Sequence, residues 1–394
     1  MRLEIRVIVG LALALVLPLA AKAAEPEARA IWWHLDMVKP EPAAGKAEID
    51  AFVNRCALAN LNLILPWTHS AYLAALDSPK YQQRYPAAKW DALGYMIETA
   101  AKHNIQVHLW YSFTYYKNHD SPEFDPEVGG NRDWAAVRED ELAPGKDGKV
   151  QPRRWGDVCN LHAGARAYTL NLLEKTLQRY PKLRGLHIEE PGFGYPGNCV
   201  CPLCQTVYKE IYGADIMGKT QLPQSVDLKC TGTTDFMRSL RVMMLKRDKS
   251  LVLSTNGGYG WTGDRSSGRD WGMWAKQGWI DYYAPQIYVA ATATLRQRSS
   301  RTIKDIGRDT QVYVGIRLRV KQQKDRDLAA AELCDFVKTI RSAGAQGIVL
   351  FWGSAFSDAQ AEALQNGPFH ENVPLPPPSR CSEQSGAEPW TNRR

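Results

Sequence analysis

The sequence has no basic run with interleaved aromatic residues, which is the pattern that follows a phosphate backbone. Its formal net charge of +7 comes from 49 basic and 42 acidic residues among 394. We therefore do not expect nucleic acid as a partner. It also has no glycine-rich phosphate loop, which leaves an open doubly wound sheet as the less favoured fold. The sequence leaves the oligomeric state open.

Long apolar runs are also scarce. The stretch VIVGLALALVLPLAA near the N-terminus is short for a membrane span. Arg2 and Arg6 precede it, the small-x-small triplet AKA ends it at residues 21–23, and no cysteine comes next to accept a lipid. We expect residues 1–23 to be a signal peptide of an exported protein, periplasmic or secreted, that has no membrane span.

Short apolar runs alternate with amphipathic helical stretches over the rest of the chain. Runs such as LNLILPW and GIVLFW are apolar on both faces, as buried parallel strands are. Eight strands, each followed by a helix, are the number that a closed (β/α)8 barrel, or TIM barrel, requires. We expect strands at 30–35, 61–67, 106–113, 183–190, 251–256, 282–288, 311–320 and 347–353, and helices beginning near residues 47, 90, 163, 233, 269, 294, 327 and 358.

A single barrel is expected over residues 24–370, because barrels often reach this size as one domain. Residues 114–162, rich in Asp, Gly, Pro and Arg, form a long insertion after the third expected strand. They follow the carboxyl end of a strand, where active-site loops lie, and we expect a substrate wall or lid. Residues 371–394 contain the run PLPPPSR and are expected to be an extended tail without a core of its own.

Two adjacent acids, Glu189 and Glu190, end the fourth expected strand in RGLHIEEPGFGYP. Carboxyl ends of barrel strands face the site, and glycosidic cleavage requires a proton donor and a second carboxylate. Neighbouring strand residues point to opposite faces, so both acids reach inward only where the strand end twists or bulges. We expect at least one to be catalytic, with Asp36 as the leading further acid. The alternative is that one of them pairs with Arg or Lys at the rim.

Other polar and aromatic residues reach the same rim by the same argument, and a carbohydrate is the partner that such side chains suit. Flat aromatic rings stack on sugar rings, and the chain has 13 tryptophans, although most of them are expected in the core. The substrate-binding candidates are His34, Trp67, His69, Trp110, Tyr111, Asn256, Tyr259, Gln286, Tyr288, Arg317 and Trp352.

Three cysteines lie within six residues directly after the acid pair, as Cys199, Cys201 and Cys204. Three thiolates and a fourth ligand hold a tetrahedral zinc ion. The candidates for that ligand are Cys159 first, then Cys230 and His162. Disulfides are the alternative, because export implies an oxidising compartment and the total of eight cysteines is even. Either way the group is expected to be structural, and no organic cofactor is expected.

The stretches RAIWWHLD, DALGYMIETAAKHNIQVHLWYSF, RGLHIEEP and RDWGMWAKQGWIDYYAPQIY together resemble the family-10-like glycosyl-hydrolase-related proteins of bacteria, from about Arg29 to Gly353. The resemblance implies a (β/α)8 barrel that acts on glycans, including cell-wall glycans in some members. In that family the fourth strand usually ends in paired aspartates, where this chain has Glu189 and Glu190.

The loop from Glu190 to Cys204 separately resembles the family-42 β-galactosidases. Those enzymes have an acid/base Glu after strand four, then a C-x-C-x-x-C zinc loop, with a further Cys from the preceding barrel loop. This resemblance implies Glu190 as acid/base, Cys159 as the fourth ligand, and zinc rather than disulfides. The chain departs from them at position 189, where they have Asn, and in VYVGIRLRV, which lacks their strand-seven nucleophile.

The sequence therefore predicts a glycoside hydrolase of a polysaccharide or oligosaccharide. Glu190 would be its proton donor and Glu189 or Asp36 the second carboxylate. Substrate-assisted cleavage of an N-acetylated sugar stays open, since it needs no enzymic nucleophile. The alternative function is a carbohydrate-binding barrel without activity, which the missing acid on strand seven favours. A metal-dependent deacetylase with His34, Asp36 and His69 as ligands is a weaker third possibility.

Overall fold

The protein folds as a closed barrel of eight parallel strands in the order β1-β10-β7-β6-β5-β4-β3-β2, which confirms the predicted (β/α)8 barrel. The structure is a computed structural model that describes residues 25–112, 121–139, 142, 157–192, 199–220, 222–320 and 326–379. The barrel strands are β1 (Ala28–His34), β2 (Leu63–His69), β3 (Gln106–Ser112), β4 (Gly185–Glu189), β5 (Val252–Gly257), β6 (Tyr282–Pro285), β7 (Gln311–Arg317) and β10 (Gly347–Phe351). A separate antiparallel pair consists of β8 (Arg319–Val320) and β9 (Arg326–Asp327).

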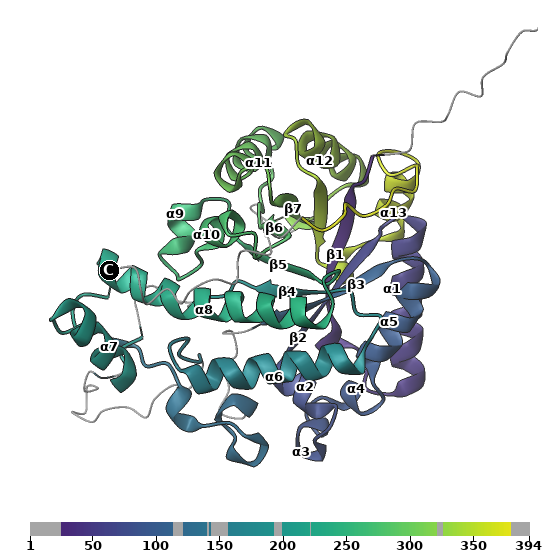
Figure 1. The fold of residues 1–394 in the computed structure, drawn as a ribbon. Coiled ribbons are helices and arrows are strands. Elements are labelled where there is room, and N and C mark those ends of the chain that lie inside the picture. Colours follow the sequence, from purple (N-terminus) through teal and green to yellow (C-terminus); the bar gives the residue numbers. More distant parts are fainter. Residues whose placement is uncertain are drawn as a thin grey trace, which may run out of the picture.

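Helices surround the barrel (Figure 1). The longer ones are α1 (Pro42–Leu58), α5 (Ala92–Lys102), α6 (Ala163–Arg179), α7 (Pro202–Tyr212), α8 (Pro223–Arg247), α11 (Thr292–Ile306), α12 (Ala330–Ser342) and α13 (Asp358–Gln365). Short helices in the connections are α2 (Ser70–Ala75), α3 (Pro79–Gln82), α4 (Pro86–Lys89), α9 (Trp261–Arg265) and α10 (Trp271–Lys276). Single 3-10 turns cover Leu35–Met37, Pro122–Phe124, Pro126–Val128, Arg132–Trp134 and Gly353–Ala355.

The helix predicted to start near Thr233 begins ten residues earlier, at Pro223 of α8. Proline suits the first turn of a helix, where its missing N–H is not needed. The segment KCTGTT inside α8 is poor in helix formers, which hid the continuous helix in the sequence. Gly232 is required there, because a Cβ atom would lie 2.6 Å from the carbonyl oxygen of Asn160. Packing against the chain before α6 therefore overrides local propensity.

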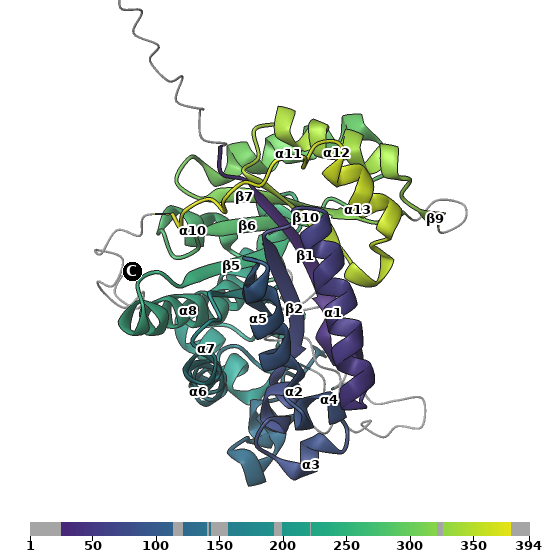
Figure 2. The ribbon, with the colours of Figure 1, turned by 90° about the vertical axis from the view of Figure 1, so that its right-hand side faces the viewer.

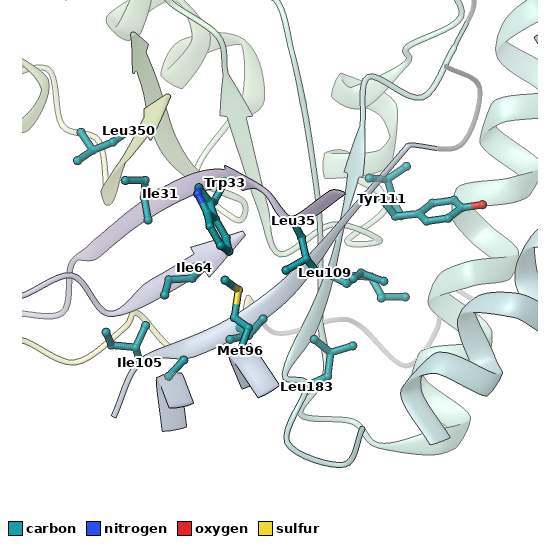
Figure 3. Close-up of a cluster of buried hydrophobic side chains, with 14 of the residues drawn as sticks. Ile31, Trp33, Leu35, Ile64, Met96, Ile105, Leu109, Tyr111, Leu183 and Leu350 are labelled. Atoms are coloured by element: carbon teal, nitrogen blue, oxygen red, sulfur yellow. The ribbon is translucent and has the colours of Figure 1, made fainter. Parts of the chain in front are cut away.

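Strand side chains alternate between the barrel interior and the layer beneath the helices. Figure 3 shows part of the outer layer, where Ile31, Leu109 and Tyr111 lie in the cluster that includes Met96 of α5. The interior is filled by Trp32, Leu65, Tyr282, Tyr313 and Val349, among others. The inward rows of β3, β4 and β5 continue to Trp110, Glu189 and Asn256, which places these three side chains at the carboxyl end of the barrel.

The chain after α13 crosses the amino-terminal mouth of the barrel, and Figure 2 shows this yellow segment passing the start of β1 and β7. Leu375 packs against the interior core. Glu27 N–H donates to the Pro374 carbonyl at 3.0 Å, and Gln311 Nε2 donates to that of Pro377 at 2.7 Å. The tail is thus extended over its described residues and docked on the barrel.

Several sequence predictions fall on parts of the chain that the structure does not describe. The predicted signal peptide, residues 1–23, lies outside the described residues, as do the end of the tail after residue 379 and much of the predicted insertion. Among the helices that are described, none is both long enough and apolar enough to cross a membrane.

Candidate active site

Glu189 is the last residue of β4, and its carboxyl group is held by two neutral donors. Trp110 Nε1 from β3 and Asn256 Nδ2 from β5 each donate to Oε2 at 2.5 Å. No described residue forms a hydrogen bond to Oε1. Burial, followed by the negative charge of Glu190, raises the pKa of Glu189 to about 7. This carboxyl group is therefore protonated in a large share of molecules near neutral pH.

Glu190 follows with a φ of 31°, in the left-handed region that residues other than glycine rarely adopt. The bend leaves both acids in contact with one amide, because Asn256 accepts from Glu190 N–H at 2.7 Å while its Nδ2 donates to Glu189. The Glu190 carboxylate forms an ion pair with Arg269 at 2.9 Å. The alternative that one acid pairs with an arginine at the rim therefore holds for Glu190.

Arg269 was not among the predicted site residues. It precedes α10, and it also contacts Asp264 of α9 at 3.3 Å. Asp264 in turn accepts hydrogen bonds from Trp271 Nε1 at 2.8 Å and from the Tyr283 hydroxyl at 2.9 Å. These bonds fix the guanidinium beside Glu190.

The close approach of two loops brings Arg269 to Glu190. A Cβ atom on Gly192 would lie 2.4 Å from the Ser267 carbonyl oxygen, so only glycine lets the chain after Glu190 pass there. On the other side, buried Lys229 of α8 donates to the Ser266 carbonyl at 2.8 Å. The loop that carries Arg269 is thus held from both sides.

Aromatic rings line the barrel interior next to Glu189. The ring centroids of Trp110 and Trp67 are 6.3 Å apart, and that of His34 lies 5.5 Å from Trp110 and 5.1 Å from Trp67. Asp36 lies 3.6 Å from Nδ1 of His34. Asp36 is thus linked to Glu189 through intervening rings, and no direct contact between the two acids is present.

Four further predicted residues come from β6, β7 and β10 or directly follow them. Tyr288 stacks on Phe351 at 5.3 Å, and burial with the charges of Glu189 and Glu190 raises the pKa of Tyr288 well above its usual value. The Arg317 guanidinium lies 5.7 Å from the Trp352 ring. Gln286 forms a parallel β-bridge with Gly315. Side chains alternate along the strand, so Gln286 points into the barrel as Tyr282 does.

Three predicted residues lie away from the acids. Tyr111 points into the layer beneath the helices (Figure 3). His69 is buried, its Nδ1 accepts from Tyr72 N–H at 3.3 Å, and burial lowers its pKa to about 3, so its ring is neutral. The Tyr259 ring lies 4.3 Å beneath the guanidinium of Arg298 on α11. Their contacts are those of packing and capping residues.

The four predicted cysteine ligands lie together. The Sγ atoms of Cys159, Cys199, Cys201 and Cys204 are all within 4.8 Å of one another, buried, and no disulfide forms among the described cysteines. The Sγ atoms of Cys159 and Cys204 are 3.4 Å apart, and those of Cys159 and Cys201 are 3.7 Å apart. Tetrahedral zinc with bonds of ~2.3 Å holds its sulfurs at ~3.8 Å. The four residues therefore fit a tetrahedral metal ion.

The other metal-site prediction is not supported. Within the described part of the chain, the cysteine cluster is the one group of three or more His, Cys, Asp or Glu side chains placed to hold a metal ion. His34, Asp36 and His69 do not form such a group. Cys230, the second choice as a zinc ligand, instead has its thiol 3.5 Å from the Arg265 carbonyl oxygen.

A closed parallel barrel with a carboxyl pair where a strand ends is an arrangement that barrel glycoside hydrolases and their relatives share. Within that class, the chain belongs to the Glycosyl hydrolase-like 10 family, whose profile matches residues 65–328. This confirms the predicted family resemblance. The comparison with curated proteins gives no match.

Solved structures share the fold at low sequence identity. The glycoside hydrolase domain of PgaB (BpsB) from Bordetella bronchiseptica has a TM-score of 0.61 at 15% identity, over 89% of this chain and 100% of that one. The β-galactosidase from Bacillus circulans sp. alkalophilus has a TM-score of 0.53 at 14% identity, over 83% and 50%. The spore cortex-lytic enzyme SleL from Bacillus cereus has a TM-score of 0.51 at 9% identity, over 91% and 76%.

Proposed function

We propose that this protein is a glycoside hydrolase and that Glu189 is its proton donor. The observation that carries the proposal is the setting of Glu189, which is held by two neutral donors beside a second carboxylate and has a pKa of about 7. A general acid must be protonated when the substrate is bound. Oε2 accepts both hydrogen bonds, so Oε1 is the atom that carries the proton to the leaving oxygen.

Glu190 has the complementary role of a second carboxylate. It forms an ion pair with Arg269, whereas Glu189 receives neutral donors, and the charge of Glu190 adds to the raised pKa of Glu189. We therefore assign the proton donor to Glu189 rather than to Glu190. The second carboxylate is Glu190, or Asp36 acting from beside His34, and substrate-assisted cleavage remains the third route.

The substrate is a polysaccharide or oligosaccharide. Trp67 and His34 are partly exposed and offer ring faces near Glu189, and partly exposed Arg317 offers hydrogen-bond donors. Buried Trp110 and Asn256 hold the Glu189 carboxyl group in place. Bacterial cell-wall glycan belongs in the first test set, because the fold is shared with a spore cortex-lytic enzyme. A carbohydrate-binding barrel without activity is the second candidate, since no acid ends β7.

The test is release of reducing ends from a panel of glycans that includes peptidoglycan strands with and without their peptides. Wild type is compared with Glu189→Gln, Glu190→Gln and Asp36→Asn, and with Glu98→Gln as a surface control. Cleavage that disappears in Glu189→Gln and persists in the control supports the proposal. Cleavage that survives Glu189→Gln contradicts it. Glycans that bind equally to all variants and are never cut would establish the binding barrel.

We also propose that Cys159, Cys199, Cys201 and Cys204 hold a structural zinc ion. Cys159 precedes α6 and the other three lie around the start of α7, so the metal would fasten together the two chain segments that flank β4. Four thiolates leave no open position, so the metal serves folding only. One zinc per chain in elemental analysis, lost in Cys201→Ser, is the expected result. Fewer free thiols than the cysteine count, with no metal, would favour disulfides.

We propose, finally, that residues 1–23 direct export and are removed. N-terminal sequencing of the protein from a periplasmic or secreted fraction is expected to begin at Ala24. An intact Met1 on the exported protein would contradict the cleavage site.

A further inference from the structure

Trp261 is an exposed tryptophan at the end of the barrel that holds the acids. It begins α9, in the connection after β5, and is 37% exposed. Among the described residues the other exposed large hydrophobic side chains are Met37, Leu58, Ile211 and Leu222, so Trp261 is the aromatic one in this group. A single exposed hydrophobic side chain is common on protein surfaces, so the argument for Trp261 depends on how its ring is held and on what lies beside it.

The indole ring is fixed in place rather than loose on the surface. Its Nε1 donates to Asp270 at 2.7 Å, and Asp270 also accepts from Arg265 at 3.2 Å. Gly272 lies against one face, where a Cβ atom would be 2.7 Å from the ring. A glycine at this position lets the backbone of α10 cover that face. The residue keeps 37% of its surface exposed, and the orientation of its flat ring is set before any ligand arrives.

The same short helix connects this ring to the acid pair. Asp264 lies three residues after Trp261 in α9 and contacts Arg269, which forms the ion pair with Glu190. On the other side, the Arg301 guanidinium lies 3.9 Å from the position that a Cβ atom of Gly260 would take. This places a hydrogen-bond donor for sugar hydroxyls next to the start of α9.

We propose that Trp261 is an outer sugar-binding platform, on which one ring of a long glycan chain stacks while a linkage further along lies at Glu189. The apolar C–H face of a sugar covers the exposed indole, and hydroxyls at its edge accept hydrogen bonds from Arg301. This inference rests on the proposed function, because it assumes that the glycan runs from Trp261 to the acid Glu189. It adds that the substrate is a polymer strand rather than a disaccharide.

The test measures the dependence of cleavage and of binding on glycan length. Wild type, Trp261→Ala, Trp261→Phe and the control Ile211→Ala are compared on the glycan that the panel identifies, or on peptide-free peptidoglycan strands where it identifies none. We expect Trp261→Ala to lower kcat/KM on long strands at least ~10-fold and to leave the shortest substrate unchanged, because remote binding energy is lost. Trp261→Phe keeps a smaller ring, so we expect a smaller loss of kcat/KM, again on long strands only. Where Trp261→Ala does not fold, an unchanged length dependence in Trp261→Phe overturns the platform.

The possible outcomes separate this inference from the proposed function. Equal kcat/KM at every length in wild type and Trp261→Ala overturns the platform and leaves the hydrolase standing. Equal losses on short and long substrates also overturn it. Strands that bind but are never cut, with weaker binding in Trp261→Ala on long strands only, support the platform and overturn the hydrolase. Absence of both cutting and binding overturns both.

Discussion

Each end of the barrel holds a carboxyl group, and the two groups differ in their hydrogen-bond partners. Asp281, just before β6, is bound by the guanidinium of Arg241 at 2.9 Å and 3.3 Å and by Leu253 N–H at 2.8 Å. Glu189, at the end of β4, receives only neutral donors and lies beside Glu190. Burial raises the pKa of both acids. A cation makes the first a fixed structural charge, whereas neutral donors leave the second free to exchange a proton near pH 7.

The surroundings of the two acids follow the same division. At the amino end, the docked tail covers the mouth, and Ser379 donates to the Asp281 carbonyl at 2.8 Å. At the carboxyl end, Glu189 and Glu190 remain partly accessible. The closed end contributes to stability, and the open end is available for chemistry.

Removing the Arg241 guanidinium from the closed end should change the free energy of unfolding most. Arg241→Ala leaves Asp281 buried without its partner, and we expect the free energy of unfolding to fall by about 3–5 kcal/mol in denaturant titrations. The matched control is Lys182→Ala, which breaks the exposed pair with Glu98 and should cost less than about 1 kcal/mol. Similar losses in both variants would contradict the structural role of the buried pair.

Neutralising Glu189 at the open end should raise the free energy of unfolding, whereas Arg241→Ala lowers it. The pKa of Glu189 is higher in the folded protein than in the unfolded chain, so stability falls as pH rises through about 7. Glu189→Gln should therefore stabilise the protein by about 3 kcal/mol at pH 8.5 and have little effect at pH 4. Thermal unfolding at both pH values measures this. A variant that is less stable than wild type at pH 8.5 would show that Glu189 is structural.

The docked tail offers a smaller test of the closed end. Leu375→Ala removes a partly buried side chain from the barrel mouth, and we expect a loss of about 1 kcal/mol in unfolding free energy with unchanged cleavage. Pro377→Ala, whose exposed ring is lost while its carbonyl stays bonded to Gln311, is the control. A change in cleavage at matched folding would mean that the two ends are coupled.

The smallest expected effect is a shift in the pKa of Glu189 when Glu190 is neutralised. Glu190→Gln removes the like charge that raises the pKa of Glu189, so that pKa should fall. Where Asp36 or the substrate supplies the second group, so that Glu190→Gln still cuts, the alkaline limb of its kcat/KM profile should move to lower pH, because the protonated form of Glu189 is the active one. Loss of all cleavage in Glu190→Gln would instead identify Glu190 as the second carboxylate. Asp36→Asn should not move this limb. An alkaline limb that stays in place in Glu190→Gln would rule out Glu189 as the titrating group.

Apolar periodicity was enough to predict the barrel from the sequence. All eight strands were placed within a few residues, because runs such as LNLILPW are apolar on both faces. Docking of the tail was not predictable, since Leu375 lies in a proline run whose binding surface exists only after the barrel closes. Position at a strand end also did not reveal which side chains point into the barrel. Trp110 does, whereas its neighbour Tyr111 points to the outer layer.

At the site, residue type and position identified Glu189 and Glu190 but not the difference between them. That difference depends on Arg269, which is 79 residues away in the chain and reaches Glu190 only because Gly192 allows two loops to touch. The cysteine spacing predicted three ligands of one cluster. Cys159 was the first of three candidates for the fourth ligand, the resemblance to known zinc loops also favoured it, and the structure places its thiol among the other three.

The most direct measurement is the protonation of Glu189, followed by NMR of 13C-labelled glutamate side chains as a function of pH. We predict a carboxyl resonance that titrates near pH 7, is absent in Glu189→Gln and titrates at lower pH in Glu190→Gln. Glu123→Gln identifies the resonance of Glu123, whose pKa is also raised by burial. If no resonance lost in Glu189→Gln titrates near pH 7, then Glu189 is not the proton donor.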